Sequence, residues 1–270
     1  MVIKYLDSKR ISALAADTKP TNVETNSILV EKDTGKRRWF NGTAWAAENW
    51  DINDDFSSYL SQGTADAVWI PDSTAVDVNI TADNLNMDRT GSDQTVYRDV
   101  LGANVSDTAW VCRYTLNHSA GSFANLGEYH GFFMSDTVNT HWATSVDGIG
   151  SRNSMHASAA YLRTMSAWDT EGSSMSNVGE DAGIGDFSVA TGTIYPCETI
   201  RLSATTHDFT KYDNDSDYTE GTNDLTAAGT CTSTTQSLRY FTSVGNTGTG
   251  GSLVSQLDLF KFADGVTTAP

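Results

Sequence analysis

The chain has 270 residues, 39% of them hydrophobic and 10% aromatic, which is enough apolar material for the core of a large folded domain. Its formal net charge of −17 is unevenly placed, because residues 1–50 hold 8 basic and 6 acidic side chains (+2) while residues 51–270 hold 9 and 28 (−19). Residues 51–270 are acidic enough to repel phosphate backbones, so we expect no nucleic-acid partner. No run approaches eighteen apolar residues, so we expect no membrane insertion.

The first 27 residues carry few strand signals. The stretch YLDSKRISALAAD (5–17) is compatible with a short helix, and TKPTN (18–22) is typical of a loop. The start, MVIKYLDSKR, is charged too early for a secretory signal peptide.

Residues 28–48 predict a three-stranded β-meander. The strands are ILVEKD (28–33), KRRWF (36–40) and TAWAAE (43–48), and Asn41-Gly42 between the last two is a type I′ turn signal.

Such a meander is too small to bury its own aromatic side chains. We therefore expect residues 1–49 to form an association module that packs against copies of itself or against a neighbouring protein. Basic residues would meet acidic surface there, and aromatic residues would be buried, giving an interface of Arg37, Arg38, Trp39, Phe40 and Trp45.

Residues 50–270 contain a series of short strand signals without helical periodicity. They predict an all-β fold, a two-sheet antiparallel jelly-roll sandwich. Trp69 and Trp110 lie inside apolar runs and are expected in the core. The runs are AVWI (67–70), VDVNI (76–80), TAWVCRYTL (108–116), HGFFMS (130–135), TIRLSATT (199–206), SLRYFTSV (237–244) and LVSQLDLFKF (253–262).

The order of three segments in this body carries a family resemblance. DDFSSY (54–59) opens it, VSDTAWVCRYTL (105–116) lies in the middle, and LVSQLDLFKFADGV (253–266) closes it. This order resembles the concanavalin A-like, laminin-G-like jelly-roll modules of marine microbial and viral surface proteins, and covers about residues 51–266. The resemblance implies that the DDF strand pairs with the late LDLFKF strand.

The front segment carries a second resemblance. Residues 16–45, ending in RRWFNGTAW, resemble the "DT…WNGTxW" modules of phage and archaeal-virus structural proteins such as fibre, tail or capsid-associated proteins. The resemblance implies a virion component that is assembled in the host cytoplasm and ends on the virion surface. Otherwise we expect an extracellular protein.

An acidic segment is the main metal candidate. In DNDSDYTEGTND, Asp213, Asp215 and Asp217 occupy alternate positions, and Asp224 is the twelfth residue of the segment. Tyr218 replaces the glycine that an EF-hand needs, so two interpretations stay open: a looser Ca²⁺ loop or a plain acidic hairpin loop. A weaker alternative groups Asp54 or Asp55 with Asp258 or Asp264. No motif demands another cofactor.

Three cysteines, Cys112, Cys197 and Cys231, form no C-x-x-C pair. The odd number and the spacing argue against a zinc site and a disulfide framework; at most one pair could form, and buried free thiols are expected.

Sugar binding requires exposed aromatic rings, because their faces stack on the apolar face of a pyranose. Tyr129, Trp142 and Trp168 lie near turn-rich segments and are the candidates. Glu128 and His130 could share a strand face. The paired carboxylates of a glycoside hydrolase are absent from the sequence pattern, so we expect no enzyme.

Three functions are compatible with these features. The first is a non-enzymatic structural or adhesive protein, a homo-oligomer on the exterior of a virion that displays a lectin-like jelly roll to host glycans. The alternative is a carbohydrate-binding module of a cell-surface or secreted protein. The third is a polysaccharide-cleaving enzyme on the same fold.

Overall fold

The computed structural model describes most of the chain, and its regular elements are strands, which confirms the all-β fold. None of the described residues forms a helix that is long and apolar enough to cross a membrane. The described residues are 4–7, 10–14, 17–32, 37–40, 42–43, 45–47, 50–59, 65–71, 76–81, 84–90, 94–122, 129–138, 148–155, 162–171, 174–177, 192–212, 225–230, 237–246 and 252–269.

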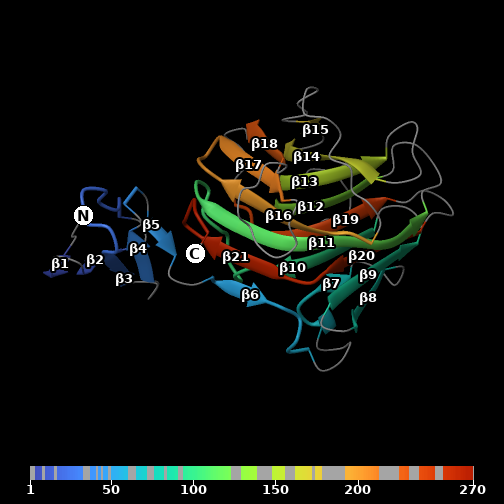
Figure 1. Ribbon diagram of the computed structural model, residues 1–270, viewed down its shortest axis with the longest axis horizontal. Coiled ribbons are helices and arrows are strands. Elements are labelled where there is room, and N and C mark those ends of the chain that lie inside the picture. Colours follow the sequence, from blue (N-terminus) through green and yellow to red (C-terminus); the bar gives the residue numbers. More distant parts are fainter. Residues whose placement is uncertain are drawn as a thin grey trace.

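The first five described strands form a sheet of their own, here called the N-terminal sheet (Figure 1). Its order follows the sequence: β1 (Lys4–Asp7), β2 (Arg10–Ala13), β3 (Ile28–Glu31), β4 (Arg37–Phe40) and β5 (Trp45–Ala47). The last three strands confirm the predicted meander.

The helix expected at 5–17 is wrong, because β1 and β2 occupy that stretch and β2 pairs in parallel with β3. Ile11 and Ala13, two residues apart, face the same side of β2 and are at most 1% exposed. They complete a small core with Leu29 and Phe40, so burial against the meander overrides the local helix propensity.

Two further sheets pack face to face as an antiparallel sandwich, as predicted (Figure 1). Neighbouring strands of the first, called the β10–β19 sheet, are β15 (Ser174–Asn177), β14 (Leu162–Glu171), β13 (Gly148–Met155), β12 (Tyr129–Ser135), β19 (Tyr240–Asn246), β10 (Gln94–Asp99) and β7 (Ile70–Pro71). Those of the second, called the β11–β16 sheet, are β18 (Leu225–Thr230), β17 (Thr206–Lys211), β16 (Ile194–Arg201), β11 (Trp110–Ser122), β20 (Ser252–Leu257), β9 (Asn84–Thr90) and β8 (Val76–Thr81). Beside this row, β21 (Phe260–Asp264) pairs with β11, and β6 (Ile52–Asp54) pairs with β21.

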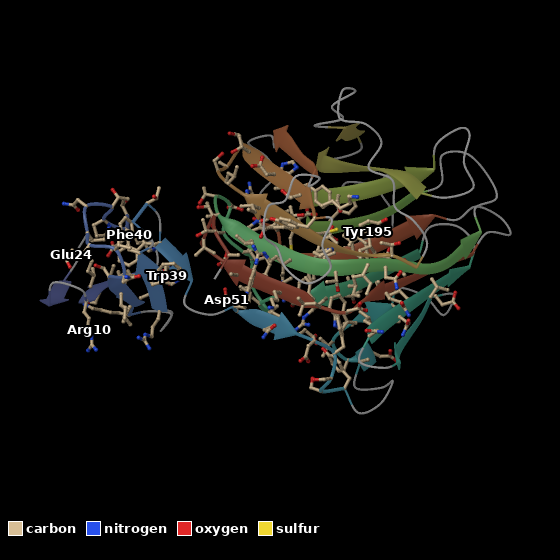
Figure 2. The ribbon with its side chains drawn as sticks, viewed as in Figure 1. Arg10, Glu24, Trp39, Phe40, Asp51 and Tyr195 are labelled. Atoms are coloured by element: carbon tan, nitrogen blue, oxygen red, sulfur yellow. The ribbon has the colours of Figure 1, made fainter. Side chains whose placement is uncertain are left out.

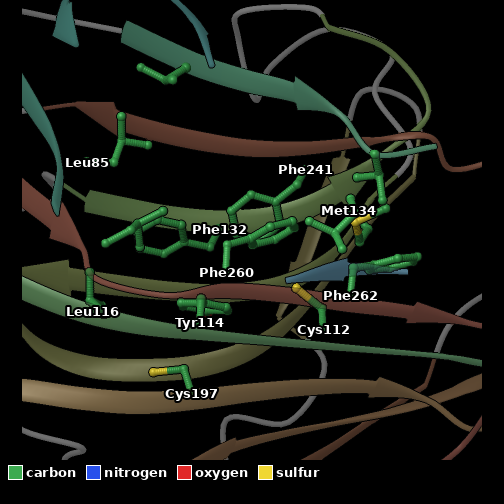
Figure 3. Close-up of a cluster of buried hydrophobic side chains, with 14 of the residues drawn as sticks. Leu85, Cys112, Tyr114, Leu116, Phe132, Met134, Cys197, Phe241, Phe260 and Phe262 are labelled. Atoms are coloured by element: carbon green, nitrogen blue, oxygen red, sulfur yellow. The ribbon is translucent and has the colours of Figure 1, made fainter. Parts of the chain in front are cut away.

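The core between the two sheets is rich in aromatic rings (Figure 3). Tyr114 of one sheet lies 4.9 Å from Phe132 of the other, and Phe241 lies 4.5 Å from Phe260, measured between ring centroids. Trp69 and Trp110 are both fully buried, as predicted. These contacts fix how the two sheets face each other.

The early strand β6 pairs with the late strand β21, as the family resemblance implied, with Asp54 opposite Phe260. Asp54 is 8% exposed and accepts hydrogen bonds from the Phe56 amide (3.0 Å), the Tyr59 hydroxyl (2.6 Å) and Arg98. Burial, and then the Asp54 carboxylate, raise the pKa of Tyr59 to about 12, so this phenol stays a donor.

The structure gives the weaker cation alternative no support at Asp54, and for Asp55 with Asp258 it stays a prediction. Protein donors occupy the Asp54 carboxylate, and the register places Asp264 at the far end of β21, beyond the residues that pair with β6. No group of three or more metal-binding side chains occurs in the described part of the chain.

The N-terminal sheet contacts the sandwich through Arg38. Its Nε donates to Glu31 Oε1 of the same sheet (2.6 Å), and its Nη2 donates to the backbone carbonyl of Asp264 in the body (3.2 Å). The Asp264 amide in turn donates to Asp51 in the segment that links the two parts (2.7 Å; Figure 2). Arg38 is 5% exposed, so this joint is a desolvated contact.

Candidate functional site

The most suggestive surface lies on the outer face of the β10–β19 sheet, where β10 and β19 end. Residues alternate between the two faces of a strand. Val96 and Phe241 point into the core, which places Tyr97 and Tyr240 on the outer face. Both tyrosines are partly exposed.

The two tyrosine rings support each other. Their centroids are 6.0 Å apart and their planes meet at 88°, the edge-to-face arrangement that aromatic pairs favour. Neither phenolic hydroxyl forms a hydrogen bond with another described residue. Two amphipathic rings therefore reach the surface side by side.

A charged pair borders the rings. Arg239 donates from Nε and Nη2 to Asp99 Oδ2 (3.1 and 2.5 Å), and its guanidinium carbon lies 5.3 Å from the Tyr240 centroid. Asp99 Oδ1 also accepts from the Gly102 amide (2.8 Å). The hydrogen bond from Arg239 lowers the pKa of Asp99, and the same bond raises the pKa of Arg239, so both stay ionised at neutral pH.

Backbone hydrogen bonds hold this end of the sheet in place. The Val100 amide donates to the Arg239 carbonyl (3.1 Å), and the Arg239 amide donates to Ser135 of β12 (2.8 Å). Nearby, the Val105 amide donates to the Leu238 carbonyl (2.7 Å). The loops that follow β10 and precede β19 are thus joined, which makes the tyrosine and charged pairs a preformed group.

The predicted sugar-binding residues fall partly within the structure. Trp142 lies outside the described residues, and so do the side chains of Tyr129 and Trp168. The backbone register places Trp168 opposite Gly150, Gly150 opposite Phe133, and Phe133 opposite Thr242. Since Thr242 is opposite Tyr97, the Trp168 position belongs to the same row across the sheet as Tyr97.

Four residues of this candidate site, Tyr97, Asp99, Arg239 and Tyr240, were not predicted. Each lies in an ordinary strand signal, either TVYRDV or LRYF. Only the pairing of β10 with β19, which sets Asp99 opposite Tyr240, brings them together. The alternation of Tyr97 and Asp99 was the available signal, but it does not identify the partner strand.

The predicted interface residues are divided between surface and interior. Arg37 is exposed and Trp39 is partly exposed, whereas Phe40 is 1% and Trp45 8% exposed within the single chain. The latter two rings pack against each other at 5.2 Å, and Trp45 Nε1 donates to the Pro20 carbonyl (2.8 Å).

The sequence argument for that interface held that the meander could not bury these rings by itself. Ile11 and Ala13 of β2, with Val23, supply the missing cover, so Phe40 and Trp45 need no second chain for their burial. Arg38 does reach the body, although its carboxylate partner is Glu31 in its own sheet. Association through the interface stays a prediction, and Arg37 and Trp39 are its accessible members.

The predicted calcium ligands, Asp213, Asp215, Asp217 and Asp224, lie outside the described residues. The strands on either side are described: Lys211 ends β17 and pairs with Leu225, the first residue of β18. The acidic segment therefore joins two neighbouring antiparallel strands, and calcium binding there stays a prediction.

A second polar group lies on the outer face of the β11–β16 sheet. Glu198 is 5% exposed and accepts from Arg113 Nε (2.5 Å) and the Tyr212 hydroxyl (2.9 Å). Arg113 also lies 5.7 Å from the centroid of Trp50. These internal contacts engage the carboxylate, so the group stabilises the sheet.

No protein-family model matches the sequence, and no curated protein matches it. Several solved structures resemble the fold. Lectin I-B4 from Griffonia simplicifolia, in its metal-free form, is 14% identical over 80% of this chain and 99% of its own, with a TM-score of 0.46. The metal-free Emp46p carbohydrate recognition domain is 10% identical over 81% and 99%, with a TM-score of 0.49.

A bifunctional GH43-CE protein from Bacteroides eggerthii is 10% identical over 90% of this chain and 34% of its own, with a TM-score of 0.47. Identities of 14% or less and TM-scores below 0.5 mark all three as distant similarities of fold. None of them bears on the resemblance of residues 16–45 to virion modules.

Proposed function

We propose that the chain is a non-catalytic carbohydrate-binding protein whose ligand surface is centred on Tyr97 and Tyr240. The observation that carries this proposal is the preformed pair of partly exposed rings beside the Asp99–Arg239 pair, with hydroxyls that no other described residue engages. A lectin and a carbohydrate recognition domain occur among the structures of similar fold, but the proposal rests on these four residues.

The chemistry of these groups suits a pyranose ring. An aromatic face packs against the apolar C–H face of a sugar, and polar groups at its border fix the orientation of the hydroxyls. The phenolic oxygens of Tyr97 and Tyr240 can donate and accept, and Asp99 retains carboxylate lone pairs beyond those used by Arg239 and Gly102. Because the rings are already held in place, little ordering is required on binding.

Three buried carboxylates of the described residues form ion pairs with arginines and are therefore not candidates for catalysis. A glycosidase requires an acid and a nucleophile or base facing the scissile bond. Asp54 pairs with Arg98, Glu198 pairs with Arg113, and Glu31 pairs with Arg38. Each of these acids is neutralised by an arginine, which leaves none of the three poised for proton transfer.

The virion role, the homo-oligomer, the surface location and bound Ca²⁺ remain predictions. A virion or cell-surface position would put a sugar-binding face in reach of host glycans, so those predictions are compatible with the proposal.

Glycan-array binding of the full chain tests the proposed function. Tyr240→Ala removes one ring and is expected to weaken binding about two- to tenfold, in line with roughly 0.5–1.5 kcal/mol for an aromatic contact. Trp39→Ala is the matched control, because Trp39 is a partly exposed aromatic residue of the N-terminal sheet, and it should leave binding unchanged. Absence of binding to any glycan, or equal loss in both variants, would refute the proposal.

A further inference from the structure

We infer that the ligand of the Tyr97–Tyr240 surface is a neutral sugar and that glycans bearing carboxylates or sulfates are rejected, an inference that rests on the proposed function. It follows from two features: the Arg239 cation is paired with Asp99, and residues 51–270 carry a strong negative charge.

The cation of the site is occupied within the protein. Arg239 directs two donors at Asp99 Oδ2 and lies against the Tyr240 ring. Arginine binds carboxylates and sulfates through its fork of N–H groups, and here the Nε–Nη2 edge of that fork already holds a carboxylate. Asp99 thereby balances the charge of Arg239, so an acidic sugar that approached the remaining N–H groups would meet a paired cation beside an ionised carboxylate.

The groups left for a ligand carry no unpaired positive charge. Asp99 is ionised and can only accept, while the hydroxyls of Tyr97 and Tyr240 can accept or donate. A neutral sugar offers hydroxyl donors to these acceptors and a C–H face to the rings. A uronate or sulfate ester brings a negative charge, which the paired Arg239 and Asp99 do not balance.

The long-range field acts in the same direction. Residues 51–270 carry a net charge of −19, so an anionic polysaccharide is repelled before it makes contact. A neutral glycan experiences no such repulsion. The local pairing and the overall charge therefore select the same class of ligand.

Matched pairs of polysaccharides test this inference. Polygalacturonate with its carboxyl-reduced form, and β-1,4-mannan with β-1,4-polymannuronate, share ring stereochemistry and linkage and differ in the carboxylate at C6. We expect the full chain to bind a neutral member at least tenfold more tightly than its acidic partner. If an acidic member binds as well as the neutral one, the inference is wrong and the proposed function stands. If neither member of any pair binds and the array is also blank, the proposed function itself fails.

Asp99→Asn tests the mechanism of selection. The change keeps the side-chain size and leaves Arg239 without its carboxylate, so the variant should bind the acidic member at least tenfold more tightly than the parent does. Binding of the neutral member should weaken. A melting curve identifies any variant that has lost its fold, and Asp99→Ser, which also frees Arg239, then replaces it. An unchanged ratio of neutral to acidic binding in a folded variant would overturn the inference.

Discussion

Replacing Asp54 by asparagine should destabilise the sandwich more than its small change in volume suggests. Asp54 connects the first strand of the body to Arg98 of β10, and it also accepts from Tyr59 and the Phe56 amide. The amide of asparagine retains the shape but removes the charge. Arg98, whose side chain is only 15% exposed, would then be a nearly buried cation without its counterion.

The magnitude follows from this desolvation. Removing one partner of a buried ion pair costs about 3–5 kcal/mol. Arg98 keeps cation–π contacts with Trp69 (5.4 Å) and Phe260 (5.5 Å), which offset part of the loss. We therefore expect the lower end of the range, a decrease of about 3 kcal/mol in the free energy of unfolding. For a chain of this size that corresponds to a fall in melting temperature of roughly 6–12 °C.

Urea denaturation of four proteins measures this effect: the parent, Asp54→Asn, Arg98→Met and the double variant. Because the double variant contains neither charge, it should be more stable than the sum of the single losses predicts, by at least about 1 kcal/mol. Additive losses would show that the two charges do not stabilise each other. A loss below about 1 kcal/mol for Asp54→Asn would refute the assignment of Asp54 as a buried charge.

Three other predictions concern the joint, pH and the thiols. Gly265 has φ +71°, and a Cβ there would lie 2.8 Å from Arg38 Nη2, so Gly265→Ala should displace Arg38 and speed amide hydrogen exchange at the joint. Gly192→Ala is the control, because Gly192 has a similar φ of +78° but open space around it, and it should leave exchange at the joint unchanged. Burial, aided by a neighbouring arginine, lowers the pKa of His207 to about 4, so between about pH 6.5 and 4 the unfolded chain binds a proton that the folded chain does not, and stability falls as the pH drops. His207→Gln should flatten this fall in pH-dependent denaturation, and an equal slope in both proteins would contradict the prediction. Burial raises the thiol pKa of both Cys112 and Cys197, so a thiol reagent at pH 8 should modify neither until the protein unfolds. Prompt modification of either thiol in the native protein would disprove their burial.

The sequence predicted the class of fold because its signals are local. Strand-length apolar runs and the Trp69 and Trp110 positions identified the sandwich and its core. The pairing of β6 with β21 came from a family resemblance, since sequence alone does not show which strands meet.

The failures have a common physical cause, which is long-range pairing. Residues 10–13 have no strong strand pattern, and they form β2 because β3 offers an edge and Leu29 a surface to cover. The burial of Phe40 was assigned to a second chain because the sequence does not show that β2 joins the meander and covers this ring. The candidate site depends on the contact between Asp99 and Arg239, which are 140 residues apart in sequence, so periodicity could not reveal it.

The central claim is tested most directly by mapping a bound glycan on the isotope-labelled full chain. After the array identifies a binding oligosaccharide, it is titrated while backbone amide chemical shifts are recorded by NMR. The account predicts that the largest saturable shifts fall in residues 95–102 and 237–243, at the adjacent ends of β10 and β19. Saturable shifts confined to the N-terminal sheet or to the outer face of the β11–β16 sheet would contradict it.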